Sequence, residues 1–243
     1  MKEKIIEFSA HKEYLEINED FPKPIKVNIP AWFKKLNHNL DDITVKGCVP
    51  FLQTLVSGYL LTLPQSFHLK HNSFTKDMIK TTLSASVHED LGYNLNIFSR
   101  AEQHPPKQVK GSPHLKKNSS LFVNKFLNPW KIKTPPGYSC LFLPPLNNAD
   151  ERFSIIPAIV DTDTFEMHIN FPFIVNGDKF PVLDTQLKKG SPYVQVIPFK
   201  RDSWKMKIKS ENRDDNIWQK SKYWLSNLHN YKNIFWNKDI TWK

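Results

Sequence analysis

Eighteen prolines are spread through the 243 residues of the chain, and they limit the length that any helix or strand can reach. Proline has no backbone N–H and a fixed φ, so it interrupts helices and is confined to the ends and edges of strands. From residue 121 onward, short apolar segments that alternate with polar residues follow one another, separated by turn residues. This pattern predicts a mainly β protein.

The clearest apolar or alternating segments after residue 120 predict strands at 121–126, 138–143, 155–160, 167–173 and 193–199. Earlier in the chain, the sequence also predicts β-structure at residues 51–63, 80–88 and 93–98. The Pro- and Lys-rich residues 101–120 are predicted to form a long loop. Thr134-Pro135-Pro136-Gly137 predicts a turn, and Asn176-Gly177 predicts a hairpin between 171–175 and 180–183.

Composition divides the chain into three predicted parts: an irregular Pro-rich arm (1–45), a β-rich core (46–200) and a basic, Trp-rich tail (201–243). The tail carries five of the seven tryptophans. Its apolar residues recur at the spacing of one helix face, which predicts a C-terminal helix, at Ile217, Trp224, Leu228, Tyr231 and Phe235.

The formal charge of +10 is concentrated in two segments. Residues 101–133 contain seven lysines and one glutamate, and residues 200–243 contain eleven basic and five acidic residues. Basic residues interleaved with tryptophans are typical of surfaces that bind nucleic acid, although a helix packed on the protein body has the same composition. A polyanion, a nucleotide or a phage or host protein is therefore a candidate partner of these segments.

Several classes of protein are disfavoured by the sequence. No apolar run approaches the roughly 20 residues that a membrane-spanning helix needs, and no signal peptide is recognisable, so we expect no membrane partner. Cys48 and Cys140 are expected to be buried free thiols. Seven glycines are too few for the usual glycine-rich nucleotide-binding loops.

Four motifs resemble a family of tailed-bacteriophage proteins to which no activity is assigned: Asn128-Pro129-Trp130, TPPGYS (134–139), VDTD (160–163) and QVIPFKR (195–201). The resemblance covers roughly residues 45–235. It implies that the protein is found in the cytoplasm of a phage-infected host cell or in the virion.

A second, distant resemblance is to the β-clip core of deoxyuridine triphosphatases and deoxycytidine triphosphate deaminases. It rests on the order of PPGY (135–138), IVDTD (159–163) and GSPYVQ (190–195). It implies a β-clip-like antiparallel barrel or sandwich and a homo-oligomer, with a trimer favoured. By this resemblance Asp161 corresponds to the base that orients the attacking water, and Gln195 to a phosphate-binding glutamine. Tyr138 lies where those enzymes begin a strand.

The sequence departs from that enzyme pattern at three places. Pro144-Pro145-Leu146-Asn147 stands where the enzymes have an arginine and a serine for phosphate. Thr164 replaces the tyrosine that stacks on the sugar, with Phe165 adjacent, and no glycine follows Gly190 to form a closing arm. Few groups remain to stabilise charge on a reacting phosphorus.

Other candidate sites depend on residue type and spacing alone. Asp161 and Asp163 are the candidate catalytic pair. No cofactor is predicted, and the alternative is that the two carboxylates bind a divalent cation. The basic loop could hold a phosphorylated ligand through Lys107, Lys110, Lys116 and Lys117. Candidate metal ligands are His88 and Asp90 with His168, or His68 and His71 with His104 or His114.

The sequence therefore favours a non-catalytic phage accessory or structural protein that acts by self-association and binding. The first alternative is an enzyme or binder of a phosphorylated, nucleotide-like ligand that uses Asp161. The second alternative is a nucleic-acid-binding protein that uses the basic aromatic tail.

Overall fold

The structure is a computed structural model that describes residues 4–17, 19–85, 102–104, 106–115, 117–120, 122–210, 231–232, 236 and 242–243. The chain forms two compact units. The first comprises Met1–Lys23 and Gly58–Lys200, and the second comprises Pro24–Ser57 and Arg201–Lys243. The predicted mainly β class is confirmed, because four antiparallel sheets account for most of the regular structure of the described chain.

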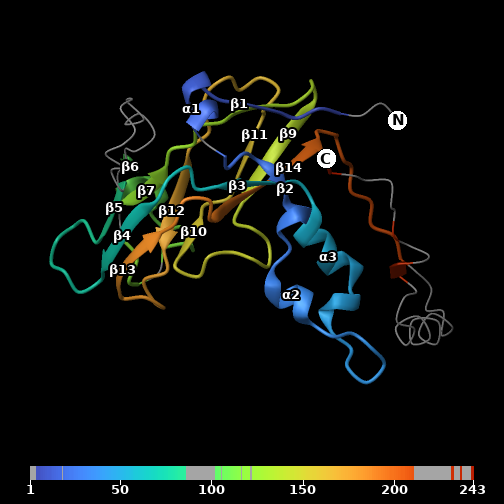
Figure 1. The fold of residues 1–243 in the computed structure, drawn as a ribbon, viewed down its shortest axis with the longest axis horizontal. Helices are drawn as coiled ribbons and strands as arrows, with labels where there is room; N and C mark the ends of the chain where they lie inside the picture. Colours follow the sequence, from blue (N-terminus) through green and yellow to red (C-terminus); the bar gives the residue numbers. More distant parts are fainter. Residues whose placement is uncertain are drawn as a thin grey trace. The chain divides into compact units, whose positions relative to one another are not determined.

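The first unit contains the sheets (Figure 1). The five-stranded sheet has, in spatial order, β11 (Ala158–Val160), β9 (Tyr138–Leu143), β14 (Pro192–Lys200), β3 (Tyr59–Thr62) and β2 (Lys23–Pro24). The four-stranded sheet has β10 (Phe153–Ile155), β12 (Phe171–Val175), β7 (Val123–Phe126) and β6 (Glu102–His104). The three-stranded sheet has β13 (Val182–Leu187), β4 (Phe67–Asn72) and β5 (Thr81–Ala85). The last sheet pairs β1 (Glu7–Ser9) with β8 (Lys131–Lys133). The helical segments are α1 (Lys12–Ile17) and the 3₁₀ turn Pro106–Val109.

An aromatic cluster forms the centre of this unit. The Phe126 ring stacks on Phe173 of β12 with centroids 4.2 Å apart. It also meets Phe67 of β4, Phe153 of β10 and Tyr193 of β14 edge-on. One core therefore joins the five-, four- and three-stranded sheets, and β14 buries successive residues because it lies between β9 and β3.

The second unit is described mainly at Pro24–Ser57, which forms short helices. These are Ile25–Asn28 (3₁₀), α2 (Ala31–Lys35), Val45–Gly47 (3₁₀) and α3 (Val49–Val56). The Phe33 and Phe51 rings stack, and Trp32 meets both edge-on. Residues 201–210 belong to the same unit and contain neither helix nor strand.

Some local predictions are wrong. Residues 51–56, predicted as the start of a strand, belong to α3, where Pro50 occupies the first turn and Val49 and Leu55 are buried. The Asn176-Gly177 hairpin does not form, because β12 and β13 belong to different sheets. The predicted strand 167–173 begins only at Phe171, and the predicted loop 101–120 contains β6.

Other predictions fall partly or wholly outside the described residues. These are the strand at 93–98 and, apart from Tyr231, the apolar face of the C-terminal helix. The three-part division of the chain stays a prediction. None of the described helices has the length and apolar character to cross a membrane. Cys48 is exposed, contrary to expectation, whereas Cys140 is a buried free thiol as predicted.

Candidate functional site

The two candidate catalytic carboxylates, Asp161 and Asp163, connect their own turn by hydrogen bonds to the turn that precedes β9 and to the start of that strand. Asp163 accepts a hydrogen bond at 2.8 Å from the backbone N–H of Gly137, which has a φ of 83° in the predicted Pro-Pro-Gly turn. Asp161 accepts one at 2.7 Å from the hydroxyl of Ser139, two residues further along β9. The Asp161 carbonyl also accepts from the backbone N–H groups of Thr164 and Phe165, so the segment closes a turn of its own.

Thr162 completes this connection from a fully buried position. Its hydroxyl lies 2.7 Å from the Thr134 hydroxyl and donates to the Cys140 sulfur at 3.3 Å. Burial raises the pKa of the Cys140 thiol to about 11, against the effect of that hydrogen bond, so the thiol stays protonated. We call residues 134–140 and 161–163 together the turn clamp. The TPPGYS and VDTD motifs thus form one hydrogen-bonded unit.

Gln195 holds a second turn. Its side chain is fully buried on β14, and Oε1 accepts a hydrogen bond at 2.8 Å from the backbone N–H of Leu146. Leu146 follows Pro144-Pro145, which cannot donate backbone hydrogen bonds themselves. The glutamine thereby secures the turn after β9 to the middle of the sheet.

Replacing Gln195 by methionine should remove that acceptor while nearly preserving the volume of the side chain. The Leu146 N–H then remains in a region with poor access to water, which should lower the free energy of unfolding by about 1–3 kcal/mol. Urea denaturation of both proteins measures the difference. Gln186→Met, on an exposed position of β13, is the control and should change stability little. Equal effects of the two substitutions would show that Gln195 does not secure the turn.

Of the remaining residues predicted to bind a ligand, Tyr138 and Phe165 belong to or adjoin the turn clamp, whereas the lysines lie on the segment after β6. Phe165 is partly buried against the hydrophobic core. The Lys4 amine lies 5.7 Å from the ring centroid of Tyr138. Lys110 and Lys117 are exposed on the segment after β6, and the side chains of Lys107 and Lys116 lie outside what is described.

The predicted metal ligands are not gathered either. His88 and Asp90 lie outside the described residues. His68 and His71 fall on opposite faces of β4: His68 contacts Asp184, whereas His71 is buried and its Nδ1 lies 2.8 Å from the Thr81 hydroxyl. Within the described part of the chain, no group of three His, Cys, Asp or Glu side chains could hold a metal ion.

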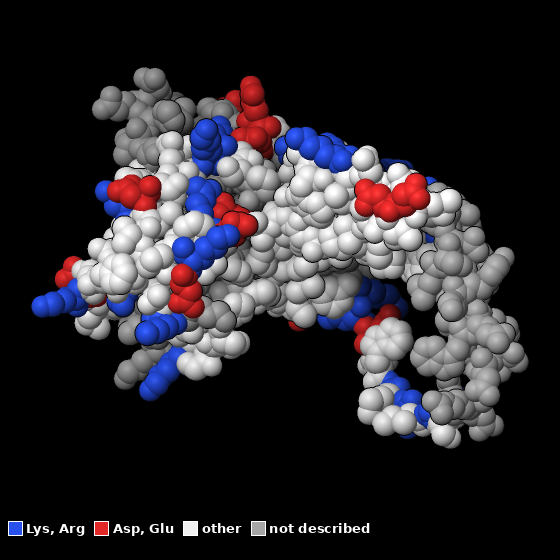
Figure 2. All heavy atoms as spheres, turned by 90° about the horizontal axis from the view of Figure 1, so that it is seen from below, with Lys and Arg blue, Asp and Glu red and all other residues white. Residues whose placement is uncertain are grey.

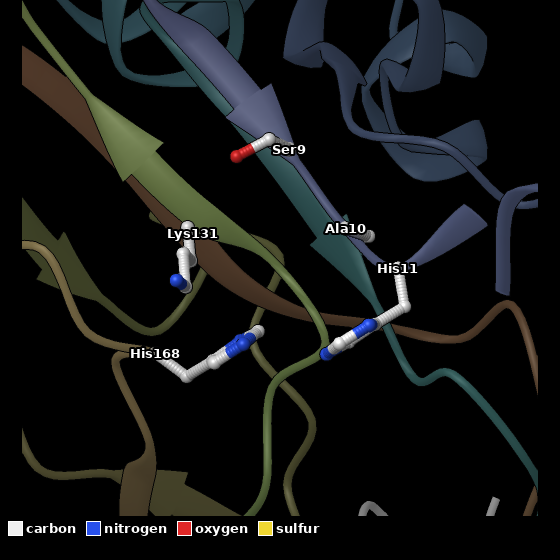
Figure 3. A pocket seen from close by; sticks show the side chains of 5 residues that line it. All are labelled: Ser9, Ala10, His11, Lys131 and His168. Carbon is white, nitrogen blue, oxygen red and sulfur yellow. The ribbon is translucent and has the colours of Figure 1, made fainter.

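His168 lines a small cavity that the sequence did not indicate. The cavity has a volume of about 190 Å³ and is lined by Ser9, Ala10, His11, Lys131 and His168 (Figure 3). The His11 and His168 rings lie nearly parallel, with 9° between their planes and centroids 6.4 Å apart. Ser9 and Lys131 are direct partners in the β1–β8 pairing. No local motif could reveal this group, because that pairing joins residues far apart in the chain.

A second cavity, of about 520 Å³, lies along β10 and β12. Two carboxylates of its lining are paired: Asp150 forms a fork with the Arg152 guanidinium, with contacts of 2.7 and 3.0 Å, and Glu151 forms an ion pair with Lys179. Arg152 also donates to the Thr185 hydroxyl and the Gln186 carbonyl of β13. The Arg152 contacts with β13 connect the four-stranded and three-stranded sheets, so Arg152 and its partner Asp150 have a structural role.

Exposed charge on the β-rich unit is mixed in sign. On the face drawn in Figure 2, Lys and Arg side chains alternate with Asp and Glu over the sheets. That face does not present the single-sign field that typifies a nucleic-acid-binding surface.

A row of large apolar side chains is exposed just after β14. Trp204, Met206 and Ile208 are 91%, 82% and 84% exposed, and Lys205, Lys207 and Lys209 alternate with them. This period of two is the pattern of a strand with one apolar and one basic face. Within the described part of the chain, residues 203–210 form no hydrogen bond or ion pair. We call residues 203–210 the exposed arm.

One edge of the five-stranded sheet has complementary properties. β11 pairs with β9 on one side, and no described strand pairs with its other side. Ile159 in β11 and Met167 beyond it are exposed apolar residues, and Asp161 and Glu166 are exposed acidic residues between them. An exposed edge strand with unsatisfied backbone groups is a template for pairing with another chain.

Comparisons with known proteins add no family. The sequence matches no family profile and no curated protein. Among solved structures, a mutant dUTPase from phage phi11 of S. aureus matches with a TM-score of 0.36 and 10% identity, covering 86% of this chain and 99% of that chain. A mutant dUTPase of Staphylococcus bacteriophage 80alpha matches with a TM-score of 0.35 and 10% identity, covering 86% and 90%. Both scores are low, so no activity follows from these similarities.

Proposed function

We propose that the chain is a non-catalytic phage accessory or structural protein that acts by self-association, through insertion of its exposed arm onto a neighbouring copy. The observation that carries this proposal is the exposure of Trp204, Met206 and Ile208 in a row at strand spacing. Burying a large apolar side chain contributes about 1.5–3 kcal/mol, so three of them supply a substantial driving force for association.

The acceptor that we propose is the free edge of β11 in the next copy. Adding the arm as a further strand would satisfy backbone groups of both segments. The apolar row would contact Ile159 and Met167, and the arm lysines would face Asp161 and Glu166. Complementary charge of this kind fixes register and orientation more than it adds affinity.

This contact would also produce a closed oligomer. The arm and the β11 edge are different surfaces, so each copy donates to one neighbour and accepts from another. Such head-to-tail contacts close into rings, and a cyclic trimer on a β-clip-like core is the assembly that we favour. The proposed setting is the host cytoplasm during infection or the virion.

The roles of the candidate catalytic groups support a non-catalytic reading. Asp163 and Gln195 are engaged with backbone N–H groups of turns, and Asp161 with the Ser139 hydroxyl. A general base must instead reach the proton or water that it activates.

Polar replacement of the apolar row tests the proposal. We expect Trp204→Ser, Met206→Ser and Ile208→Ser together to convert the oligomer into monomer at micromolar concentration, because the apolar contact is lost. Light scattering coupled to size-exclusion chromatography measures the mass. The control replaces Lys205, Lys207 and Lys209 by serine and should keep the oligomer, since exposed ion pairs contribute about 0–1 kcal/mol each. A wild-type monomer, or an oligomer unaffected by the apolar replacements, would overturn the proposal.

The same preparations separate this proposal from its alternatives. Hydrolysis of a nucleoside triphosphate with a divalent cation, lost in Asp161→Asn, would favour an enzyme on the turn clamp. Binding of nucleic acid whose affinity falls steeply with salt would favour the basic tail as the functional element.

A further inference from the structure

We propose that the cavity between β1, β8 and the segment before β12 binds a phosphate group, either as the free ion or at the end of a small phosphate monoester. This site goes beyond the self-association proposed above, and it lies wholly within the first unit. It uses Lys131, His11, Ser9 and His168. Of these, the sequence indicates only His168, as a candidate metal ligand.

The lining supplies the donors that a phosphate needs. Lys131 provides a point charge, Ser9 a hydroxyl, and the two imidazoles further N–H donors. In Figure 3 the Lys131 side chain and both rings converge on the same space. None of the five described lining residues is acidic. Glu166, two residues before His168 in the chain, lies 3.6 Å from the Lys133 amine.

One hydrogen bond fixes the orientation of His168. Its Nδ1–H donates to the Asn128 carbonyl oxygen at 3.1 Å, because a carbonyl can only accept. Nε2 is therefore the nitrogen that takes up the second proton when the ring becomes charged, and in that state it can donate to an anion. Burial is the main cause that lowers the pKa of His168, and the charges of Lys131 and His11 lower it further. A dianion in the cavity would offset both charges and favour the protonated ring.

The geometry fits a phosphate better than a metal ion. Nearly parallel rings direct their nitrogens side by side instead of toward one point, and Lys131 would repel a cation. A third His, Cys, Asp or Glu ligand is missing from the described surroundings. The volume is below the roughly 300–1,000 Å³ of pockets that enclose a drug-sized molecule, so a compact group fits and any larger part of the ligand would lie outside.

Nuclear magnetic resonance of the histidine side chains tests the site in the full chain. Titration with inorganic phosphate should shift the His11 and His168 signals along a saturable curve and raise the pKa of His168. The His68 and His114 signals, outside the cavity, should move little. Glycerol phosphate, titrated in parallel, distinguishes the two sources: tighter binding than phosphate indicates a monoester, and equal binding indicates recognition of the phosphate group alone.

Two lysine variants provide the matched control. Lys131→Gln should weaken phosphate binding about tenfold, because a charge-assisted contact is lost. Lys133→Gln removes the other exposed lysine of β8, which does not line the cavity, and should leave the affinity within a factor of about two of wild type. Equal weakening by both variants, the absence of a saturable shift with either ligand, or saturable shifts of His11 and His168 with zinc instead would overturn the proposal.

Discussion

Replacing Phe126 by alanine is expected to lower the free energy of unfolding by about 4 kcal/mol. The ring is fully buried and contacts aromatic rings from three sheets, including Phe173 at 4.2 Å. Its removal leaves a cavity that three separately anchored sheets cannot close. A loss of this size is a large fraction of the roughly 5–15 kcal/mol that stabilises a typical domain. Denaturant unfolding followed by circular dichroism measures it.

The control for this substitution is Phe74→Ala. Phe74 is 75% exposed on the turn between β4 and β5, so its loss should change stability by less than about 0.5 kcal/mol. Phe126→Leu should fall between the two, because leucine fills part of the space. A loss below about 1 kcal/mol for Phe126→Ala would contradict the interpretation that this ring joins the sheets.

Gly58→Ala should be the second most damaging change, with an expected cost of about 3 kcal/mol. Gly58 precedes β3 with a φ of 82°, a conformation that costs an L-residue roughly 1–2 kcal/mol. In addition, an added Cβ would lie 2.1 Å from the carbonyl oxygen of Val196. Since that oxygen belongs to the backbone of β14, the sheet would have to move.

Gly137→Ala separates the two contributions. Gly137 has nearly the same φ, 83°, but no atom lies within 4 Å of the position of an added Cβ. It should therefore lose about 1–2 kcal/mol, the conformational cost alone. Thermal unfolding of both variants gives the comparison, and a Gly58→Ala protein as stable as Gly137→Ala would show that β3 and β14 tolerate the extra atom.

The fold class could be predicted because most signals for it are local. Alternation predicted β9 and β14 closely, and Pro-Pro-Gly predicted the turn before β9. Where tertiary contacts decide, the prediction failed. Asn176-Gly177 has hairpin composition, yet Gly177 lies against the backbone of Asn118, where a Cβ would be 2.2 Å from its carbonyl oxygen. The chain passes from one sheet to another at this point.

The candidate site was predictable only in part. The motifs indicated Asp161, Asp163 and Gln195 as candidate site residues. The sequence could not reveal that these side chains form hydrogen bonds that hold turns in place. The sequence did not predict the exposed arm, because Trp204 and the lysines beside it share the basic, Trp-rich composition of the tail, for which a helix is predicted. His11 and Lys131 carried no signal, since only the pairing of β1 with β8 brings them to His168.

Zero-length cross-linking between isotopically heavy and light copies of the wild-type chain tests the central claim most directly. A carbodiimide joins a lysine to a carboxylate only where the two side chains touch. Insertion of the exposed arm onto the next copy predicts amide links from Lys205, Lys207 or Lys209 to Asp161 or Glu166, each joining a heavy peptide to a light one. Links found only within single copies, or none between these residues in a mixture that contains oligomer, would contradict the proposed self-association.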